Sequence, residues 1–190
     1  QNVTRVVAQS DTVRQRLLKW RLADPEVLHP PAPPRPYRCD GYAGPLLLVS
    51  RLSPLKRIDL VLRAMARPAA SGVQLVIGGD GEAREALVRL ASDLGVQQRV
   101  TFAGRLSETG LVDQLATCRG VVFAPFAEDF GFVTVEAFAS AKAVITTSDS
   151  GGPAELVKHG RNGLVAAPDA DALAAAMAEL SAEGPLAERL

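Results

Sequence analysis

Two glutamates, Glu128 and Glu136, are separated by seven residues in a segment that also contains Gly131. A strand-like run ends just before Glu128, and a helical pattern begins after Gly131, which places Glu128 in a loop and Glu136 in the first turns of a helix. A carboxylate accepts hydrogen bonds from paired hydroxyls, and free N–H groups at a helix start attract phosphate. The segment therefore favours a ligand that carries sugar hydroxyls and phosphate. For an isolated pair of Glu, the alternative is two solvated surface acids.

A second cluster consists of three cations, Arg51, Lys56 and Arg57, within seven positions. Arg offers a bidentate fork and Lys a compact charge, and both can stabilise a diphosphate leaving group as it gains negative charge. The alternative is that Lys56 and Arg57 only begin a solvated helix face. This stretch alone does not separate the two interpretations.

The elements that must position these residues alternate strictly from Leu46 onward. We expect strands at 46–50, 73–77, 99–102, 121–124 and 144–147, and helices at 58–65, 83–93, 106–116 and 132–141. The strand runs are apolar without alternation, as in strands buried from both sides. The pattern predicts an α/β fold with a Rossmann-like, doubly wound parallel sheet and a ligand crevice at the carboxyl ends of its strands. Beyond Thr147 we expect a short helix from Pro153, a turn at Asn162-Gly163 before the apolar residues 164–166, and a final helix that begins at Asp169 or Asp171.

The first 45 residues have a different pattern. We expect a strand at 5–8, a helix from Ser10 or Asp11 to about Leu22, and then a stiff linker, because the prolines at 29–36 lack donors and restrict their neighbours. The linker is either a surface tether or a hinge, and the hinge is favoured. Residues 1–45 are thus expected to be an interdomain segment and linker from a missing N-terminal domain, and residues 46–190 the Rossmann-like domain.

Composition excludes several other classes of protein. The 190 residues are 47% hydrophobic with a formal net charge of zero, which indicates one globular α/β domain with no general surface for nucleic acid. No signal peptide or spanning segment is visible, so we expect a cytoplasmic protein. The two Cys and two His lack metal-ligand spacing. Only 5% of residues are aromatic, whereas carbohydrate-binding modules usually present aromatic platforms.

Two short motifs resemble binding sites for other ligands, but neither has the sequence context that its ligand requires. Gly78-Gly79-Asp80-Gly81 resembles a dinucleotide fingerprint, but it follows the second strand and Arg84 stands where the third Gly belongs, which disfavours NAD. The pair Asp169 and Asp171 resembles a metal-holding motif, but it precedes the final helix and is expected to cap it.

Several stretches, in this order and spacing, resemble the donor-binding half of glycosyltransferase family 4, the group 1 retaining transferases of GT-B architecture. They are Ser50-Arg51-Leu52 with Lys56, Gly79-Asp80-Gly81, residues 100–104, Glu128 through Ala137, and Gly151 through Glu155 with Asn162-Gly163-Leu164-Val165. The match spans essentially the whole chain, and residues 6–10 and 28–31 resemble the segment that joins the two domains of this family. The fold expected from the resemblance is the C-terminal half of a two-domain GT-B architecture.

The resemblance implies a nucleotide-diphosphate-sugar donor of GDP or UDP type, with no metal and no other cofactor. Arg51 and Lys56 would hold the diphosphate, Glu136 the ribose hydroxyls, and Glu128 the donor sugar. The implied catalytic residues are Glu128, Arg51 and Lys56. The implied donor-binding residues, on the ribose, sugar and base sides, are Glu136, Phe130, Gly131, Phe132, Gly104, Arg105 and Leu106.

Members of this family transfer a hexosyl group to a hydroxyl acceptor with retention, by front-face attack that needs no enzyme nucleophile. Lys56-Arg57-Ile58-Asp59 resembles members that use GDP-mannose, although Arg57 stands where many relatives have Gly. The resemblance implies that the acceptor domain is missing and that the fragment alone is inactive. The parent would be cytoplasmic, and association with the inner face of a membrane stays open. The alternatives are a non-catalytic nucleotide-binding domain and a nucleotide-sugar epimerase of the same fold.

Overall fold

The computed structural model describes residues 5–182 and is built around a six-stranded parallel sheet. The strand order is β5-β4-β3-β6-β7-β8, so the order reverses between β3 and β6, as in doubly wound folds. The strands are β3 (Leu46–Val49), β4 (Leu75–Gly78), β5 (Val100–Gly104), β6 (Gly120–Val122), β7 (Val144–Thr147) and β8 (Gly163–Ala166).

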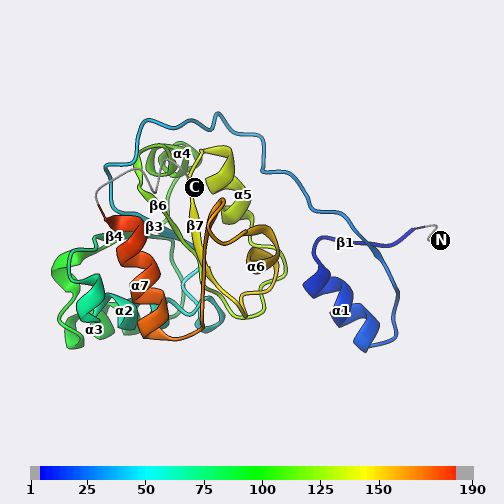
Figure 1. Ribbon diagram of the computed structural model, residues 1–190, viewed down its shortest axis with the longest axis horizontal. Helices are drawn as coiled ribbons and strands as arrows, with labels where there is room; N and C mark the ends of the chain where they lie inside the picture. Colours follow the sequence, from blue (N-terminus) through cyan, green and yellow to red (C-terminus); the bar gives the residue numbers. More distant parts are fainter. Residues whose placement is uncertain (1–4, 183–190) are drawn as a thin grey trace.

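Helices cover both faces of this sheet (Figure 1). One face carries α2 (Ile58–Met65), α3 (Arg84–Asp93) and α7 (Ala170–Ser181), and the other carries α4 (Glu108–Thr117), α5 (Phe132–Ala139) and α6 (Gly152–Leu156). Three short 3₁₀ turns complete the unit: η1 (Pro54–Lys56), η2 (Pro68–Ala70) and η3 (Gln97–Arg99).

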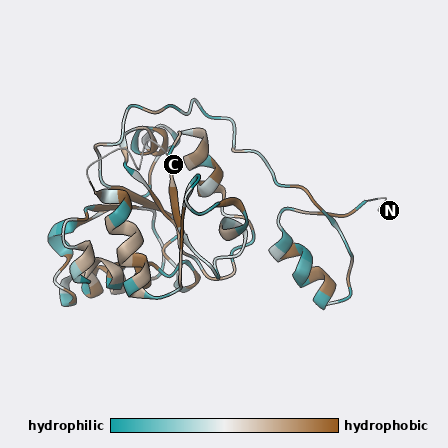
Figure 2. Cartoon of the chain, in the orientation of Figure 1, coloured by the Kyte–Doolittle hydropathy of each residue, from teal (hydrophilic) through white to brown (hydrophobic). Residues whose placement is uncertain are grey.

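Strand β3 shows why the strands are apolar throughout. Leu46 and Leu48 pack in the core under α2 and α7, whereas Leu47 packs in the core under α4 and α5. Successive side chains of a strand point to opposite faces, so a strand between two helical layers buries every one of them. Figure 2 shows hydrophobic residues concentrated in the central strands.

The beginning of the chain forms a smaller unit beside the sheet (Figure 1). Strand β1 (Val7–Ala8) pairs in parallel with β2 (Glu26–Val27), and α1 (Asp11–Lys19) connects them. The helix begins at the Ser10 cap as expected but ends at Lys19 instead of Leu22, because Arg21 adopts a left-handed conformation with φ 53°. From this unit the Pro-rich linker runs past α5 and α4 to β3.

The structure confirms the predicted α/β, doubly wound parallel sheet and corrects it in detail. Strand β8 is a sixth member of the sheet, where five strands in strict alternation were expected. Helix α2 and strand β7 have the predicted bounds, whereas β6 ends at Val122, two residues early. Within residues 5–182, no helix combines the length and the apolar character needed to cross a membrane.

Candidate functional site

The loops that follow β3 and β6 meet at the point where the strand order reverses. Lys56, after β3, forms an ion pair with Glu128, after β6, and the two side chains are only 19% and 21% exposed. The backbone N–H of Phe126 donates to the Leu55 carbonyl at 2.9 Å and so joins the same two loops. Ligand crevices of doubly wound folds lie at such a reversal. The sheet therefore brings together one of the predicted cations and one of the predicted carboxylates.

Two open hollows lie at this edge of the sheet, and Arg51 lines both of them. The first, of about 390 Å³, is lined by Arg51 with Val49, Ser50, Gly79, Asp80, Arg105, Leu106 and Leu111. The second, of about 420 Å³, is lined by Arg51 with Arg16, Ser53, Leu55, Lys56, Phe126, Ala127, Glu128 and Asp129. A ligand that extended through both hollows would pass the exposed guanidinium of Arg51 at its middle. This arrangement suits an anionic centre with a different group on each side.

The Gly-rich loop after β7 supports the backbone of Glu128. The Glu128 N–H donates to the Ser150 carbonyl at 2.9 Å, and the Gly152 N–H donates to the Glu128 carbonyl at 2.8 Å. Gly151 has φ +77°, and a Cβ there would lie 2.4 Å from the Glu128 carbonyl oxygen. These glycines therefore allow two loops to approach each other, which fixes the position of Glu128.

Helix α5 begins at Phe132, directly after the loop that follows β6 and carries Glu128, and Gly131 is its N-cap. A Cβ at Gly131 would lie 2.7 Å from the Phe123 ring, and its φ is +76°, so glycine is required on both counts. No side chain of residues 5–182 caps this helix start. Phe130 is buried and stacks on His29, with ring centroids 6.0 Å apart, whereas Phe132 is partly exposed.

Lys56 and Arg57 do not lie on a solvated helix face, the alternative that the sequence left open, because each side chain is only 19% exposed. Arg57 has φ 48° and ψ 41°, the left-handed conformation that favours Gly. Its guanidinium is 19% exposed and binds both carboxylate oxygens of Asp149 at 2.7 and 2.8 Å. It also donates to the carbonyls of Ala124 and Pro125 and to Thr147 Oγ1. Arg57 thus ties the loops after β6 and β7 to the start of α2.

The hydrogen bond from Arg57 also lowers the pKa of Asp149. Partial burial of the carboxyl opposes this shift, and Thr147 adds a further hydrogen bond to the ionised form. The carboxylate of Asp149 is therefore stabilised as an anion by the same contact that fixes the loops.

Glu136 lies in an unexpected environment, since it is 7% exposed and already bound by the linker. Its Oε1 accepts hydrogen bonds from Arg35 Nη1 and from the Tyr37 hydroxyl, the latter at 3.3 Å. Burial raises the pKa of Tyr37, the hydrogen bond from Arg35 opposes that shift, and the Glu136 charge adds to it. Tyr37 therefore remains a protonated donor at neutral pH. Sequence reasoning treated this segment as a tether or hinge and missed both residues.

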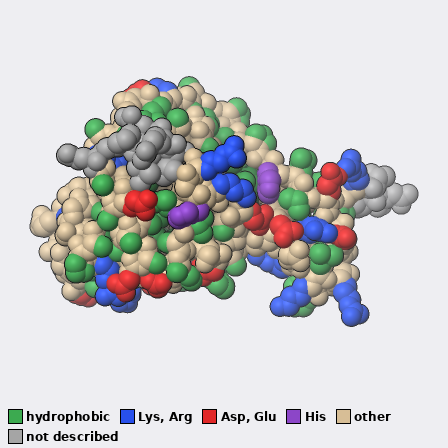
Figure 3. Space-filling model, in the orientation of Figure 1, with side chains coloured by type: hydrophobic (Ala, Val, Ile, Leu, Met, Phe, Trp, Pro, Cys, Tyr) green, Lys and Arg blue, Asp and Glu red, His purple; other side chains and the backbone are tan. Residues whose placement is uncertain are grey.

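Helix α1 supplies a further cation that sequence reasoning missed. Arg16 Nη1 lies 2.6 Å from Asp129 Oδ1, and Nη2 donates to the Ala127 carbonyl at 3.3 Å. The start of α1 is held by Glu155, which accepts hydrogen bonds from the backbone N–H groups of the first two helical residues at 2.7 and 2.8 Å. Figure 3 shows side chains of both charges gathered where the small unit meets the larger one. No local sequence signal marks Arg16 as part of the site.

Of the three residues predicted to lie near the base, two line the first hollow and one does not. Arg105 and Leu106 line the first hollow, and the Gly104 carbonyl accepts a hydrogen bond from the Gly79 N–H at 2.7 Å. The remaining predicted residues do not line either hollow: Gly104, Phe130, Gly131, Phe132 and Glu136. Gly104 and Gly131 instead shape the backbone, with φ of +70° and +76°.

No group of three or more His, Cys, Asp or Glu within the described part of the chain could hold a metal ion. Asp169 caps α7 by accepting from the N–H groups of Asp171 and Ala172 at 3.0 and 2.8 Å, so the predicted cap is confirmed.

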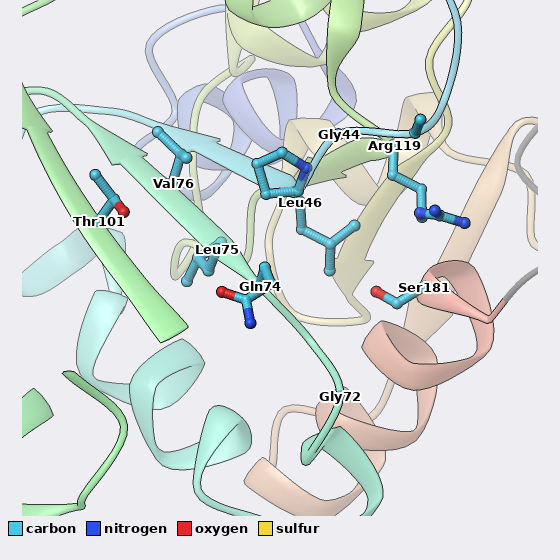
Figure 4. A pocket seen from close by; sticks show the side chains of 11 residues that line it. Gly44, Leu46, Gly72, Gln74, Leu75, Val76, Thr101, Arg119 and Ser181 are labelled. Atoms are coloured by element: carbon cyan, nitrogen blue, oxygen red, sulfur yellow. The ribbon is translucent and has the colours of Figure 1, made fainter. Parts of the chain in front are cut away.

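A further hollow of about 410 Å³ lies at the opposite edge of the sheet (Figure 4). It is lined by Leu46 and Leu75, which begin β3 and β4, and by Arg119 and Ser181. None of the predicted site residues lines this hollow, because they lie at or beyond the carboxyl ends of the strands.

Solved structures with the same fold include the lipopolysaccharide outer core galactosyltransferase WaaB and a sucrose-phosphate synthase. The chain superposes on a Staphylococcus aureus TarM mutant in complex with Fondaparinux, alpha-GlcNAc-glycerol and UDP, with a TM-score of 0.85, 19% identity, and coverage of 98% of this chain and 38% of the other. It superposes on Anabaena HepE in complex with UDP and glucose with a TM-score of 0.84, 24% identity, and coverage of 98% and 56%. These likenesses confirm the Rossmann-like fold seen in GT-B glycosyltransferases.

Sequence relatives give the family. The chain is 31% identical over 194 residues to the D-inositol 3-phosphate glycosyltransferase of Mycobacterium marinum, covering 91% of this chain and 41% of the relative. It is 36% identical to the lipopolysaccharide core biosynthesis glycosyltransferase LpsE of Rhizobium meliloti, covering 76% and 42%. The chain thus spans less than half the length of these relatives. The model of the family "Glycosyl transferases group 1" matches residues 45–190, and the chain belongs to this family.

Proposed function

We propose that this chain is the C-terminal, donor-binding half of a family 4 retaining glycosyltransferase, which transfers a hexosyl group from a nucleotide-diphosphate sugar to a hydroxyl acceptor. The observation that carries the proposal is the position of Arg51 between two hollows, with the Lys56–Glu128 pair beside it at the reversal of strand order. Family membership and the names of the relatives support sugar transfer. The short span of the chain supports a missing N-terminal acceptor domain, without which we expect no turnover.

In this proposal the diphosphate lies along Arg51 and Lys56, whose charges stabilise it as the bond to the sugar breaks, without a bound metal. Glu128 accepts hydroxyls of the sugar in the second hollow, and the base lies in the first hollow near Arg105 and Leu106. The acceptor hydroxyl attacks the anomeric carbon on the face from which the diphosphate leaves, so the configuration is retained. The surrounding chain supplies charge and position and does not form a covalent intermediate.

The sequence and the comparisons favour different nucleotides in the donor. Lys56-Arg57-Ile58-Asp59 favours GDP-mannose, whereas the solved neighbours TarM and HepE hold UDP. A cytoplasmic parent that acts at the inner face of a membrane is part of the proposal only because the family resemblance implies it. Both bases are therefore included in the test.

The test is calorimetric titration of this chain with GDP, UDP and ADP and with their mannose and glucose conjugates, in the absence of metal. We expect saturable binding of one base and a loss of about tenfold or more in Arg51→Ala, because a charged hydrogen bond contributes about 1.5–3 kcal/mol. Arg63→Ala, at an exposed site in the last turn of α2, is the matched control and keeps the affinity. If no nucleotide binds, the donor-binding proposal is overturned.

A second comparison tests the role of Glu128. Glu128→Gln is expected to lower the affinity for the sugar conjugate relative to that for the bare diphosphate, because the carboxylate is assigned to sugar hydroxyls. Equal losses for both ligands would contradict that role. Consumption of the nucleotide sugar without any acceptor would favour the epimerase alternative.

A further inference from the structure

The linker contributes two side chains to one carboxylate oxygen of α5. Arg35 Nη1 and the Tyr37 hydroxyl both donate to Glu136 Oε1, although they lie 101 and 99 residues earlier in the chain. Arg35 Nη1 also donates to the Tyr37 hydroxyl at 3.2 Å, so the three groups form a closed triangle. The Arg35 side chain is 20% exposed, which makes this a largely shielded ion pair. We name Arg35 and Tyr37 the linker clamp.

The backbone of the linker is shaped to hold this clamp. Pro34 and Pro36 flank Arg35, and a residue before proline is confined to extended conformations. The Tyr37 N–H donates to the Arg35 carbonyl at 2.8 Å, which closes a three-residue turn and brings both side chains to the same side. Few conformations are therefore lost when the clamp forms, because the chain is already restricted.

Further contacts fix the linker to the domain just beyond the clamp. Arg38 Nη2 lies 2.6 Å from Asp113 Oδ1 on α4, and the Asp40 N–H donates to the Ala116 carbonyl at 2.8 Å. The linker thus follows α5 and α4 as part of the folded unit, as its path in Figure 1 shows.

The clamp leaves the two oxygens of Glu136 in different states. Oε1 accepts a hydrogen bond from each of the two donors, whereas Oε2 accepts none from residues 5–182. Oε2 is also not one of the atoms in these residues that are both buried and without a hydrogen-bond partner. A nearly buried carboxylate is costly unless it is paired, and pairing at Oε1 meets that need. The clamp therefore holds Glu136 ionised and in one orientation, with Oε2 left to accept hydroxyl donors.

We infer that Arg35 and Tyr37 are positioning residues for ribose recognition, acting through Glu136. The inference rests on the proposed function, to which it adds the ribose contact that the family resemblance implies for Glu136. It makes a specific claim about this chain, which is that the Pro-rich linker belongs to the donor site and sets the preference for a ribose with both hydroxyls. A merely structural role of the clamp would change stability but not that preference.

The experiment measures the affinity of the chain for its preferred nucleoside diphosphate and for the 2′-deoxy form of the same nucleotide. In the unsubstituted chain we expect the ribose form to bind about tenfold more tightly, as for a hydrogen bond to a charged acceptor. Arg35→Gln is expected to reduce this preference to about twofold, whereas Arg35→Lys, which keeps the charge, retains most of it. Arg38→Gln, at the neighbouring linker ion pair, is the matched control and keeps the full preference.

Tyr37→Phe is a milder variant that removes one hydroxyl, and it is expected to reduce the preference by about threefold while thermal stability changes little. It decides the question if Arg35→Gln does not fold. An unchanged preference in Arg35→Gln, or in Tyr37→Phe in its place, would overturn the inference, as would tighter nucleotide binding, which would mean that the clamp blocks Glu136. These outcomes leave the proposed function intact, whereas no nucleotide binding by the unsubstituted chain would overturn both.

Discussion

Arg57→Ala removes the guanidinium that ties two loops of the site to the start of α2. The guanidinium binds Asp149 twice and donates to three further acceptors, two carbonyls and one hydroxyl. Breaking a buried ion pair costs about 3–5 kcal/mol, and a charged hydrogen bond contributes about 1.5–3 kcal/mol. Because the Asp149 side chain is 30% exposed and water can replace part of the contact, we expect a loss of about 3 kcal/mol. For a chain of this size the melting temperature should fall by about 6–12 °C.

Arg57→Gly is the matched comparison, because it removes the same side chain but relieves the left-handed backbone at φ 48°. A residue with a Cβ in this conformation costs about 1 kcal/mol relative to Gly. We therefore expect Arg57→Gly to be about 1 kcal/mol more stable than Arg57→Ala, as measured by urea unfolding of both variants. An Ala variant as stable as the Gly variant, or a loss below about 1 kcal/mol in both, would refute the reasoning.

The same pair predicts a dependence on pH. The pKa of Asp149 is lowered in the folded state, so its contribution to stability is full above the unfolded value of about 4 and is lost as the pH falls through the lower folded value. The difference in unfolding free energy between the unsubstituted chain and Arg57→Ala should be largest near pH 7 and smaller below about pH 4. A difference that did not change with pH would show that Asp149 is not the partner that matters.

Two further predictions concern other parts of the domain. Burial raises the pKa of Cys118 to about 12, whereas at Cys39 the effect of burial is outweighed by hydrogen bonds, including one from Lys142, which lower the pKa. At pH 8 a thiol reagent should therefore modify Cys39 before Cys118, and it should modify Cys39 more slowly in Lys142→Met. Mass spectrometry of the labelled peptides would contradict this if Cys118 reacted first. Gly79 has φ +130°, and a Cβ there would lie 1.9 Å from the Ser50 carbonyl oxygen, so Gly79→Ala should lower the free energy of unfolding in urea by about 3 kcal/mol. Gly72→Ala, with open space around its Cβ, should change it by less than about 1 kcal/mol. Similar stabilities of the two variants would argue against the contact.

The central sheet could be predicted because a strand that is buried on both faces consists of consecutive apolar residues. Every residue of 46–48 is apolar, and the structure places Leu46 and Leu47 in different cores. The same logic brought Lys56 and Glu128 to one edge, since the carboxyl ends of parallel strands share that edge. The membership of β8 in the sheet was not predicted, because α6 before it is only five residues long and gives a weak helical pattern.

The linker contacts could not be predicted in the same way. The prolines show that the segment is stiff, but stiffness does not tell which surface it meets, and Arg35 finds Glu136 across 101 residues. Hydrophobic periodicity in the sequence indicates which face of a helix or strand is buried. A single side chain in an extended segment produces no such periodicity, so its contacts cannot be predicted from it. The structural role of Arg57, which the sequence marked only as one of three clustered cations, was not predicted for a related reason, because its left-handed backbone and its acceptors come from tertiary structure.

The capping of α1 by Glu155 has a consequence for the order of folding. The helix has nine residues and buries none of them, and an isolated helix of that length is marginal in water. Its first two N–H groups are satisfied by a carboxylate more than 140 residues away, and the third is satisfied by Ser10. That carboxylate reaches its place only after the strands around β7 have assembled. We therefore expect α1, although it precedes the sheet in the sequence, to become stable last, when the folded sheet places Glu155 at its N-terminus.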